Sequence, residues 1–282
     1  MRVLGMRFSG VLIFYSMVHM YRSGGLSTDL CPAIILSVLP TLVKLFTDTS
    51  NTFNSTVQER SIRIFSQLVS DDQELQKAAL DGDAILQLAN ILTSGPKILV
   101  EEIKNEMEVD YTPKLPLWDQ TEESILLAIA SVTSLREENR RQALDSKILP
   151  RITAALSSPS TFVRAAACQC TRSLSRSVKN LRTSLVDSGV AIPLLKLLRD
   201  SDLSVQTAAS ATLCNIVLDF SPLKKIFIEH GGIESLVDMV VSSSDTTLRL
   251  NSLWALKNVL FQADSETKMR VISLLGFDVL KG

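Results

Sequence analysis

Apolar residues recur along this chain at intervals of three and four, the spacing that places them on one face of a helix. No stretch alternates apolar and polar residues with period two, so we expect helices and no strands. Three windows align without gaps: residues 162–176 (FVRAAACQCTRSLSR), 204–218 (SVQTAASATLCNIVL) and 247–261 (TLRLNSLWALKNVLF). Val163, Val205 and Leu248 occupy the same place in these windows, which indicates a repeat of 42 to 43 residues.

Each window follows an apolar helical segment, which itself follows a short helix that ends at a breaker. Gly189 and the pair Gly231 and Gly232 stand at the bend between the two segments, where a residue without Cβ can adopt positive φ. The turns SSPST, RDSDLS and SSSDTT are rich in Ser and Asp, which cap helix N-termini. The repeat is therefore predicted to be a short helix, a bend, a second helix, a polar turn and a longer third helix. Its core positions are expected to include Ile192, Leu195, Leu198, Val205, Ala209 and Leu213.

Two further units precede these three, so we predict an all-α fold in which three-helix repeats stack into an α-solenoid, a right-handed superhelix. About five repeats and a partial sixth are expected over residues 25–282. A stray helix, a partial repeat, is expected over residues 1–24. An insertion is expected at residues 93–121, with Trp118 as its anchor, because prolines interrupt any continuous helix there.

The first twenty residues carry two arginines ahead of an apolar stretch, a pattern that also resembles a signal peptide or a short membrane anchor. Polar residues interrupt the stretch, and no small-residue cleavage site follows it. These features favour a helix of the repeat array over a secretory signal.

Charge and composition exclude several classes of function. With 29 basic and 30 acidic side chains, the protein has no overall field to attract nucleic acid or an anionic membrane. Cys31, Cys168, Cys170 and Cys214 include no CxxC pair, which indicates reduced, buried thiols in a reducing compartment. We expect a cytoplasmic and nuclear protein. The chain has two histidines and none of the common metalloprotease, phosphate-loop or nucleophile motifs. We therefore expect no enzyme, no metal site and no cofactor.

The stretch LVDSGVAIPLLKLLRDSDLSVQTAASATLCNI resembles the armadillo repeat, in which a glycine-containing bend, an IPxLLxLL helix and an AxWxLxN helix follow one another. The resemblance implies an armadillo-type α-solenoid whose third helices line a concave groove, with Trp and Asn four residues apart facing it. An Asn amide can donate to and accept from the main chain of an extended peptide, and Trp forms a slot for its side chains. The pairs at these positions are Arg63 with Gln67, Ala130 with Ser134, Gln169 with Ser173, Ala211 with Asn215, and Trp254 with Asn258.

Only Trp254 and Asn258 form a full pair, whereas an armadillo adaptor of the nuclear-transport or adhesion type, the alternative function, is expected to show several. Basic residues follow in the middle repeat: Arg172, Arg176, Lys179 and Arg182. They suit an acidic tail or a C-terminal carboxylate, because guanidinium groups bind carboxylates through two hydrogen bonds.

Each of these candidates also has a purely structural interpretation. Trp254 belongs to a segment, Leu253–Phe261, that otherwise has the pattern of a buried helix, so it could fill the core between repeats. Asn215 and Asn258 could satisfy neighbouring carbonyl groups. The arginines could form a solvated face, where ion pairs contribute little.

Three strings that the repeat consensus does not require, SLSRSVKNLRTS, LCNIVLDFSP and LWALKNVLFQA, resemble the C-terminal armadillo region of the armadillo-repeat-containing protein 8 family, the scaffold subunits of the GID/CTLH E3 ubiquitin ligase. The resemblance covers Met20 to Leu280, apart from the insertion. It implies a non-catalytic scaffold that docks a substrate receptor for proteasomal degradation of target proteins, with the receptor's extended tail in the groove. Partners would be protein subunits of the ligase, with no nucleic acid, membrane or small-molecule substrate. The groove residues carried over are Arg172, Arg176, Asn215, Trp254 and Asn258.

Overall fold

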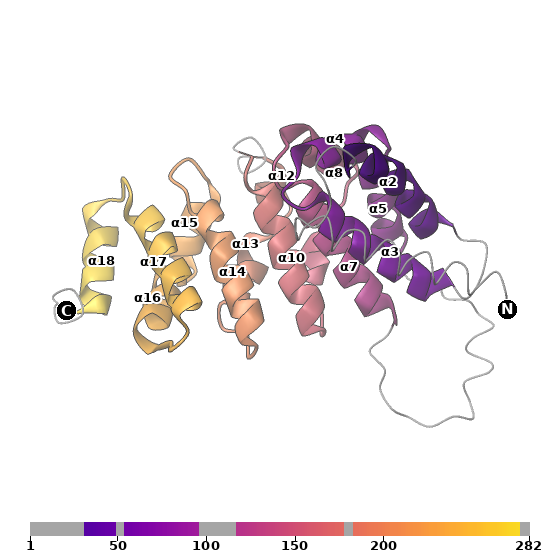
Figure 1. Ribbon diagram of the computed structural model, residues 1–282. Coiled ribbons are helices and arrows are strands. Elements are labelled where there is room, and N and C mark those ends of the chain that lie inside the picture. The colour runs from indigo at the N-terminus through magenta and orange to yellow at the C-terminus, as the bar shows by residue number, and fades with distance from the viewer. Residues whose placement is uncertain (1–30, 49–53, 96–116, 178–182, 277–282) are drawn as a thin grey trace, which may run out of the picture. The chain divides into compact units, whose positions relative to one another are not determined.

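A computed structural model describes residues 31–48, 54–95, 117–177 and 183–276 of the protein. Over these ranges the regular structure is helical without strands, which confirms the all-α prediction (Figure 1). The stray helix expected at residues 1–24 lies outside the described residues, as does most of the expected insertion. Among the described helices, none combines the length and the apolar character needed to cross a membrane.

The chain divides into two compact units, residues 1–148 and 149–282, which are treated separately below. The described helices of unit 1 are α2 (Cys31–Thr47), α3 (Asn54–Val69), α4 (Gln73–Asp81), α5 (Ala84–Ser94), α7 (Leu117–Val132) and α8 (Glu137–Asp145). Those of unit 2 are α9 (Leu149–Ala155), α10 (Thr161–Leu174), α12 (Ser184–Asp187), α13 (Ala191–Leu197), α14 (Leu203–Ile216), α15 (Leu223–Glu229), α16 (Gly232–Ser242), α17 (Thr246–Leu260) and α18 (Ser265–Leu275).

The order of these helices follows the predicted repeat. In unit 2 the third helices α10, α14 and α17 lie side by side, and α9, α13 and α16 are the second helices that pack against them (Figure 1). The short first helices α12 and α15 stand between consecutive repeats, and α18 occupies the first-helix position after α17. In unit 1 the third helices α3 and α7 pack against each other in the same way.

The bend between first and second helices uses a left-handed residue in every repeat where it is described. Gly189 has φ of 73° and Gly231 has φ of 81°, which confirms the predicted use of glycine there. The equivalent bends in unit 1 place Asp83 (φ 54°) and Lys147 (φ 57°) in the same conformation. The bend is therefore imposed by the repeat, because Lys147 adopts it against its own steric preference.

The second glycine of the pair has a different purpose from the first. An added Cβ at Gly232 would lie 2.3 to 2.4 Å from ring atoms of Phe227, which is 2% exposed. Gly232 therefore lets α15 and α16 pack closely, whereas Gly231 supplies the bend.

Aspartates in the predicted polar turns cap the helices that follow. Asp202 accepts hydrogen bonds from the backbone N–H groups of Ser204 and Val205 at the start of α14. Asp245 caps α17 and Asp264 caps α18 in the same manner. Two of the predicted turns, RDSDLS and SSSDTT, thus have the capping chemistry expected of them, whereas Ser160 in the turn SSPST makes no side-chain capping bond and Asp264 lies outside the predicted turns.

Burial agrees with the predicted core in part. Val205, Ala209 and Leu213 are buried as expected. Ile192 and Leu195 are only half-buried, while their neighbour Leu194 is fully buried. Leu198, just after α13, is buried as expected. The predicted positions within α13 were wrong, because a seven-residue helix offers too few positions to fix its buried face from spacing alone.

The expected insertion has helical ends. Helix α5 continues to Ser94 and α7 begins at Leu117, so both helices extend into the range 93–121. Trp118 lies in the first turn of α7 and is half-buried. The prolines at positions 96, 113 and 116 lie outside the described residues.

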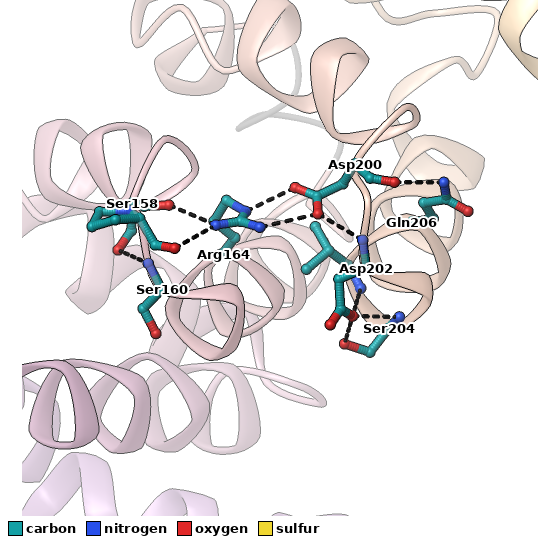
Figure 2. A network of polar contacts seen from close by, with 9 residues as sticks. Ser158, Ser160, Arg164, Asp200, Asp202, Ser204 and Gln206 are labelled. Carbon is teal, nitrogen blue, oxygen red and sulfur yellow. Dashed lines mark hydrogen bonds and ion pairs between the residues drawn. The ribbon is translucent and has the colours of Figure 1, made fainter. Parts of the chain in front are cut away.

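A mostly buried ion pair joins the second-to-third-helix turns of two consecutive repeats in unit 2 (Figure 2). Arg164 of α10 donates to Asp200 through Nε at 2.8 Å and through Nη2 at 3.0 Å. Its Nη1 donates to the carbonyl oxygens of Ser158 and Pro159, both at 2.9 Å. Asp200 also accepts from the backbone N–H of Asp202 at 3.0 Å. This network ties the turn before α10 to the turn before α14.

Candidate partner-binding surface

The exposed surface of α10, α14 and α17, hereafter the third-helix face, carries the predicted site residues. Asparagine amides link neighbouring helices of this face. Asn258 Nδ2 donates to the carbonyl of Cys214 at 2.8 Å, and Asn215 Nδ2 donates to the carbonyl of Arg172 at 3.3 Å and to Ser175 Oγ at 3.3 Å. In both cases the acceptor carbonyl lies on the preceding third helix.

These bonds fit the structural interpretation of the two asparagines, but they use only one end of each amide. Within the described residues, the Oδ1 atoms of Asn215 and Asn258 accept no hydrogen bond. Both side chains are half-exposed. The neighbouring helix therefore holds each amide in place while its oxygen remains able to accept an N–H from another chain.

A third asparagine, which the sequence analysis missed, makes the same kind of link. Asn251 Nδ2 donates to the carbonyl of Thr207 at 3.4 Å and to Ser210 Oγ at 3.3 Å. Asn251 precedes Asn258 by seven residues, two helical turns, so both amides face α14. That spacing was the available signal, although the consensus resemblance directs attention only to the second position.

Trp254 is not a core residue. Its side chain is 50% exposed, and the ammonium of Lys257 lies 4.3 Å from the ring centroid. The expectation that Leu253–Phe261 is otherwise buried is also wrong, since Leu253 is 48% exposed and Phe261 is 59% exposed. Helix α17 therefore presents a large apolar surface to its surroundings.

The exposed side chains of α17 form a stripe. Leu250, Trp254 and Lys257 follow at intervals of four and three, which places them along one helical face, and the exposed C-cap residue Phe261 follows at the end of this stripe. The asparagines occupy the neighbouring edge toward α14, and the buried positions face α16. Leu250, Lys257 and Phe261 were missed from the sequence because their spacing is equally that of a buried face.

The opposite end of the third-helix face is basic. Arg172 in the last turn of α10 and Arg176 in the turn that follows the helix are both exposed. Between them and Trp254 lies α14, whose Ala211, the partner of Asn215 in the sequence pattern, is buried. Lys179 and Arg182, the other members of the predicted basic cluster, lie outside the described residues.

The sequences of α10, α14 and α17 contain no aspartate or glutamate. Their charged residues are Arg164, Arg172, Arg249 and Lys257. In unit 1, by contrast, α3 contains Glu59 and α7 contains several acidic residues. The third-helix face of unit 2 therefore favours an anionic ligand over a cationic one.

The candidate positions of unit 1 are committed to contacts within that unit. Arg63 Nε pairs with Glu59 at 2.7 Å, and Ser134 Oγ accepts from the buried Gln76 Nε2 at 2.8 Å. Ser134 also lies beyond the end of α7. The structure therefore brings no asparagine pair to the third helices of unit 1.

The described cysteine thiols have raised pKa values, which keep them protonated and weakly nucleophilic. Burial raises the pKa of Cys168 to about 12, with the nearby Asp200 carboxylate adding to the effect. Burial likewise raises the pKa of Cys170 and, for the half-buried Cys214, outweighs the lowering influence of Arg172. These three cysteines are free, as predicted, and protonated at neutral pH. The side chain of Cys31 lies outside the described set.

Comparisons with known families agree with this architecture. The Armadillo/beta-catenin-like repeat matches residues 180–218, and the HEAT repeat matches residues 148–178. A designed armadillo repeat protein in complex with peptide (KR)4 superposes with a TM-score of 0.66 at 19% identity, covering 86% of this chain and 90% of that one. A crystal structure of computationally designed armadillo repeat proteins for modular peptide recognition also reaches a TM-score of 0.66, at 18% identity and the same coverage. The armadillo-type fold is thus confirmed.

Similar proteins extend over most of the chain. GID complex subunit 5 of Schizosaccharomyces pombe is 32% identical over 268 residues, which are 92% of this chain and 33% of that protein. Armadillo repeat-containing protein 8 of Danio rerio is 34% identical over 268 residues, 94% of this chain and 38% of that protein. The protein of the same name from Xenopus laevis is 40% identical over 152 residues, 54% of this chain and 21% of that protein. The chain therefore spans a third or slightly more of the first two relatives.

Proposed function

The chain belongs to the family that includes GID complex subunit 5 and armadillo repeat-containing protein 8, and from this premise we propose that it is a non-catalytic scaffold in a GID-type ubiquitin ligase. In this role its third-helix face binds the extended tail of a substrate receptor, so that bound target proteins are delivered for proteasomal degradation. The proposal includes action in the cytoplasm and nucleus, alongside other protein subunits of the complex.

One observation carries the proposal: the third-helix face of unit 2 has no acidic residue on its three helices, and it exposes arginines at one end and a tryptophan at the other. An anionic or carboxylate-terminated tail suits Arg172 and Arg176, whose guanidinium groups can each bind a carboxylate through two hydrogen bonds. A large apolar side chain of the tail suits the half-exposed ring of Trp254.

The asparagines would hold the main chain of the tail. Because Asn215 and Asn258 are fixed through Nδ2 by the preceding helix, their Oδ1 atoms are oriented before the ligand arrives. Such preorganisation lowers the entropic cost of binding. One hydrogen bond contributes only about 1 kcal/mol net, so affinity depends on both amides and both ends of the face together.

The test is co-purification of the tagged full chain, followed by mass spectrometry of the bound proteins. Wild-type protein is expected to retain ligase subunits including a receptor, and the double variant Trp254→Ala with Asn258→Ala is expected to lose the receptor while the helical circular dichroism signal survives. Leu253→Ala is the matched control, because Leu253 is 48% exposed on the same helix but points about 100° away from Trp254. Equal loss of receptor in the control would contradict the proposed face.

A peptide titration separates this function from that of a nuclear-transport type adaptor. The C-terminal tail of the retained receptor, made as a labelled peptide, should bind the wild-type chain, and the basic peptide (KR)4 should not. Tight binding of (KR)4 would favour the alternative adaptor, because only a face that attracts cations holds such a peptide.

A further inference from the structure

Ser158 is followed by a proline and is accessible to solvent. The chain contains three hydroxyl residues that precede proline, namely Thr112, Ser158 and Ser221. Thr112 lies outside the described residues, and Ser221 is buried at 4% exposure. Ser158 is half-exposed in the turn between α9 and α10, and its neighbours Ser157 and Pro159 are exposed. A protein kinase that requires proline after its target can therefore reach Ser158 where it cannot reach Ser221.

A guanidinium group lies directly beside this hydroxyl residue. Arg164 Nη1 donates to the carbonyl oxygens of Ser158 and Pro159, both at 2.9 Å (Figure 2). The Ser158 side chain is held at the same turn, because its Oγ accepts from the backbone N–H of Ser160 at 3.2 Å. A phosphate on Ser158 Oγ is therefore placed within reach of Arg164.

Arg164 is already engaged with another anion. Its Nε and Nη2 atoms donate to the two carboxylate oxygens of Asp200, at 2.8 and 3.0 Å. Asp202, a second carboxylate, follows in the same turn. Phosphoserine brings a charge of about −1.5 to −2, which attracts the guanidinium more strongly than a single carboxylate and repels Asp200.

The start of α10 favours the phosphate as well. Its N-cap residue Ser160 makes no side-chain capping bond, whereas Asp202 caps α14 and Asp245 caps α17. A negative charge near the N-terminus of a helix interacts favourably with the uncapped N–H groups.

We propose that Ser158 is a phosphorylation site and that its phosphate takes Arg164 away from Asp200, which loosens the tie between the repeats of α10 and α14. A proline-directed protein kinase transfers the γ-phosphoryl group of ATP to Ser158 Oγ. A new O–P bond forms, the bond between the γ-phosphorus and the bridging oxygen breaks, and ADP leaves. The hydroxyl proton passes to the catalytic base of the kinase.

The first test is phosphorylation of the full chain by a proline-directed kinase with ATP, with the sites mapped by mass spectrometry. Ser158 is expected to be modified, and Ser158→Ala and Pro159→Ala are each expected to remove that modification. Ser221, in the folded chain, should remain unmodified. Absence of phosphate on Ser158, or its persistence in Pro159→Ala, would overturn the assignment.

The second test uses thermal unfolding to ask whether Arg164 exchanges Asp200 for the phosphate. Phosphorylation should lower the unfolding midpoint of the wild-type chain by about 2–4 °C. In Asp200→Asn, which has no carboxylate to displace or repel, phosphorylation should raise the midpoint instead. A similar lowering in both proteins would show a general disturbance of the turn and refute the exchange.

A third measurement reports the contact directly and does not depend on stability. In a pH titration followed by phosphorus NMR, the phosphoserine should lose its second proton below the ordinary value of about 6, because Arg164 stabilises the dianion. Asp200→Asn should lower that midpoint further by freeing the guanidinium, and Arg164→Gln should raise it to about 6 or above, because the carboxylates of Asp200 and Asp202 then remain without the guanidinium. Identical midpoints in the three proteins would overturn the proposal.

Discussion

The ion pair of Arg164 and Asp200 allows a direct measurement of what holds consecutive repeats together. Arg164→Met keeps the length and apolar stem of the side chain but removes every donor, and Asp200→Asn removes the charge at nearly constant shape. The two side chains are 14% and 9% exposed, and two parallel hydrogen bonds join them. Together with the double variant they form a thermodynamic cycle that isolates the pairwise free energy.

The magnitude follows from burial and geometry. Exposed ion pairs contribute about 0–1 kcal/mol, whereas breaking a buried pair costs about 3–5 kcal/mol. Because this pair is mostly buried and bidentate, Arg164→Met should lower the free energy of unfolding by about 3 kcal/mol, part of it from the two carbonyl oxygens that lose their donor. The coupling free energy between the two residues should be about 2 kcal/mol at neutral pH.

The coupling should also depend on pH with a definite sign. Burial alone would raise the pKa of Asp200, but hydrogen bonds from Arg164 and from the backbone N–H of Asp202, with the charge of Arg164, outweigh it and hold the pKa below its usual range. A carboxylate whose pKa is lowered by folding stabilises the fold at pH values above its pKa in the unfolded chain, which is about 3.9. That contribution is lost as the pH falls through the lower pKa that the group has in the folded chain. The cycle should therefore show full coupling above about pH 4 and a progressive loss below it.

Urea denaturation followed by far-ultraviolet circular dichroism measures each free energy in the cycle. Because repeats can unfold separately, hydrogen exchange of the backbone amides should be measured as well. In the variants, the amides of α10 and α14 should lose protection before those of the other helices. A coupling free energy below about 0.5 kcal/mol at neutral pH would refute the reasoning, as that value is typical of an exposed pair.

Three further outcomes test the backbone and the binding face. In urea denaturation, Gly189→Ala should cost about 1–2 kcal/mol from backbone strain alone, because an added Cβ meets no atom within 4 Å. Lys147→Gly should stabilise the protein by about 0.5–1 kcal/mol, and opposite signs for the two variants would contradict the shared bend. Gly232→Ala should lower the thermal midpoint more than Gly189→Ala does, since its Cβ collides with the buried ring of Phe227, and an unchanged midpoint would show that the ring can move freely. Arg176→Glu should weaken binding of a receptor-tail peptide, with a loss that shrinks as salt increases, and a loss independent of salt would argue against charge recognition.

The fold was largely predictable because it depends on repetition. A buried face recurs in each long helix, polar caps recur in each turn, and a bend recurs between each first and second helix. The bends at Asp83 and Lys147 were missed, since their residue types do not signal positive φ. Stacking imposes that conformation at each of the four described bends, and Gly189 and Gly231 are the positions where glycine removes its steric cost.

The binding face was harder to predict because helical spacing cannot distinguish a buried stripe from an exposed one. In α17 the asparagine edge and the apolar stripe of Trp254 and Phe261 lie about 60–80° apart, and both have the three- and four-residue periodicity of a core. The two edges differ in what lies beside them. Carbonyl groups of α14 accept hydrogen bonds from the amides of Asn251 and Asn258, whereas no described helix covers Trp254. A tryptophan and an asparagine can therefore lie on neighbouring edges of one exposed helical surface, because the amide is fixed by the preceding repeat and the exposed ring remains available to a partner.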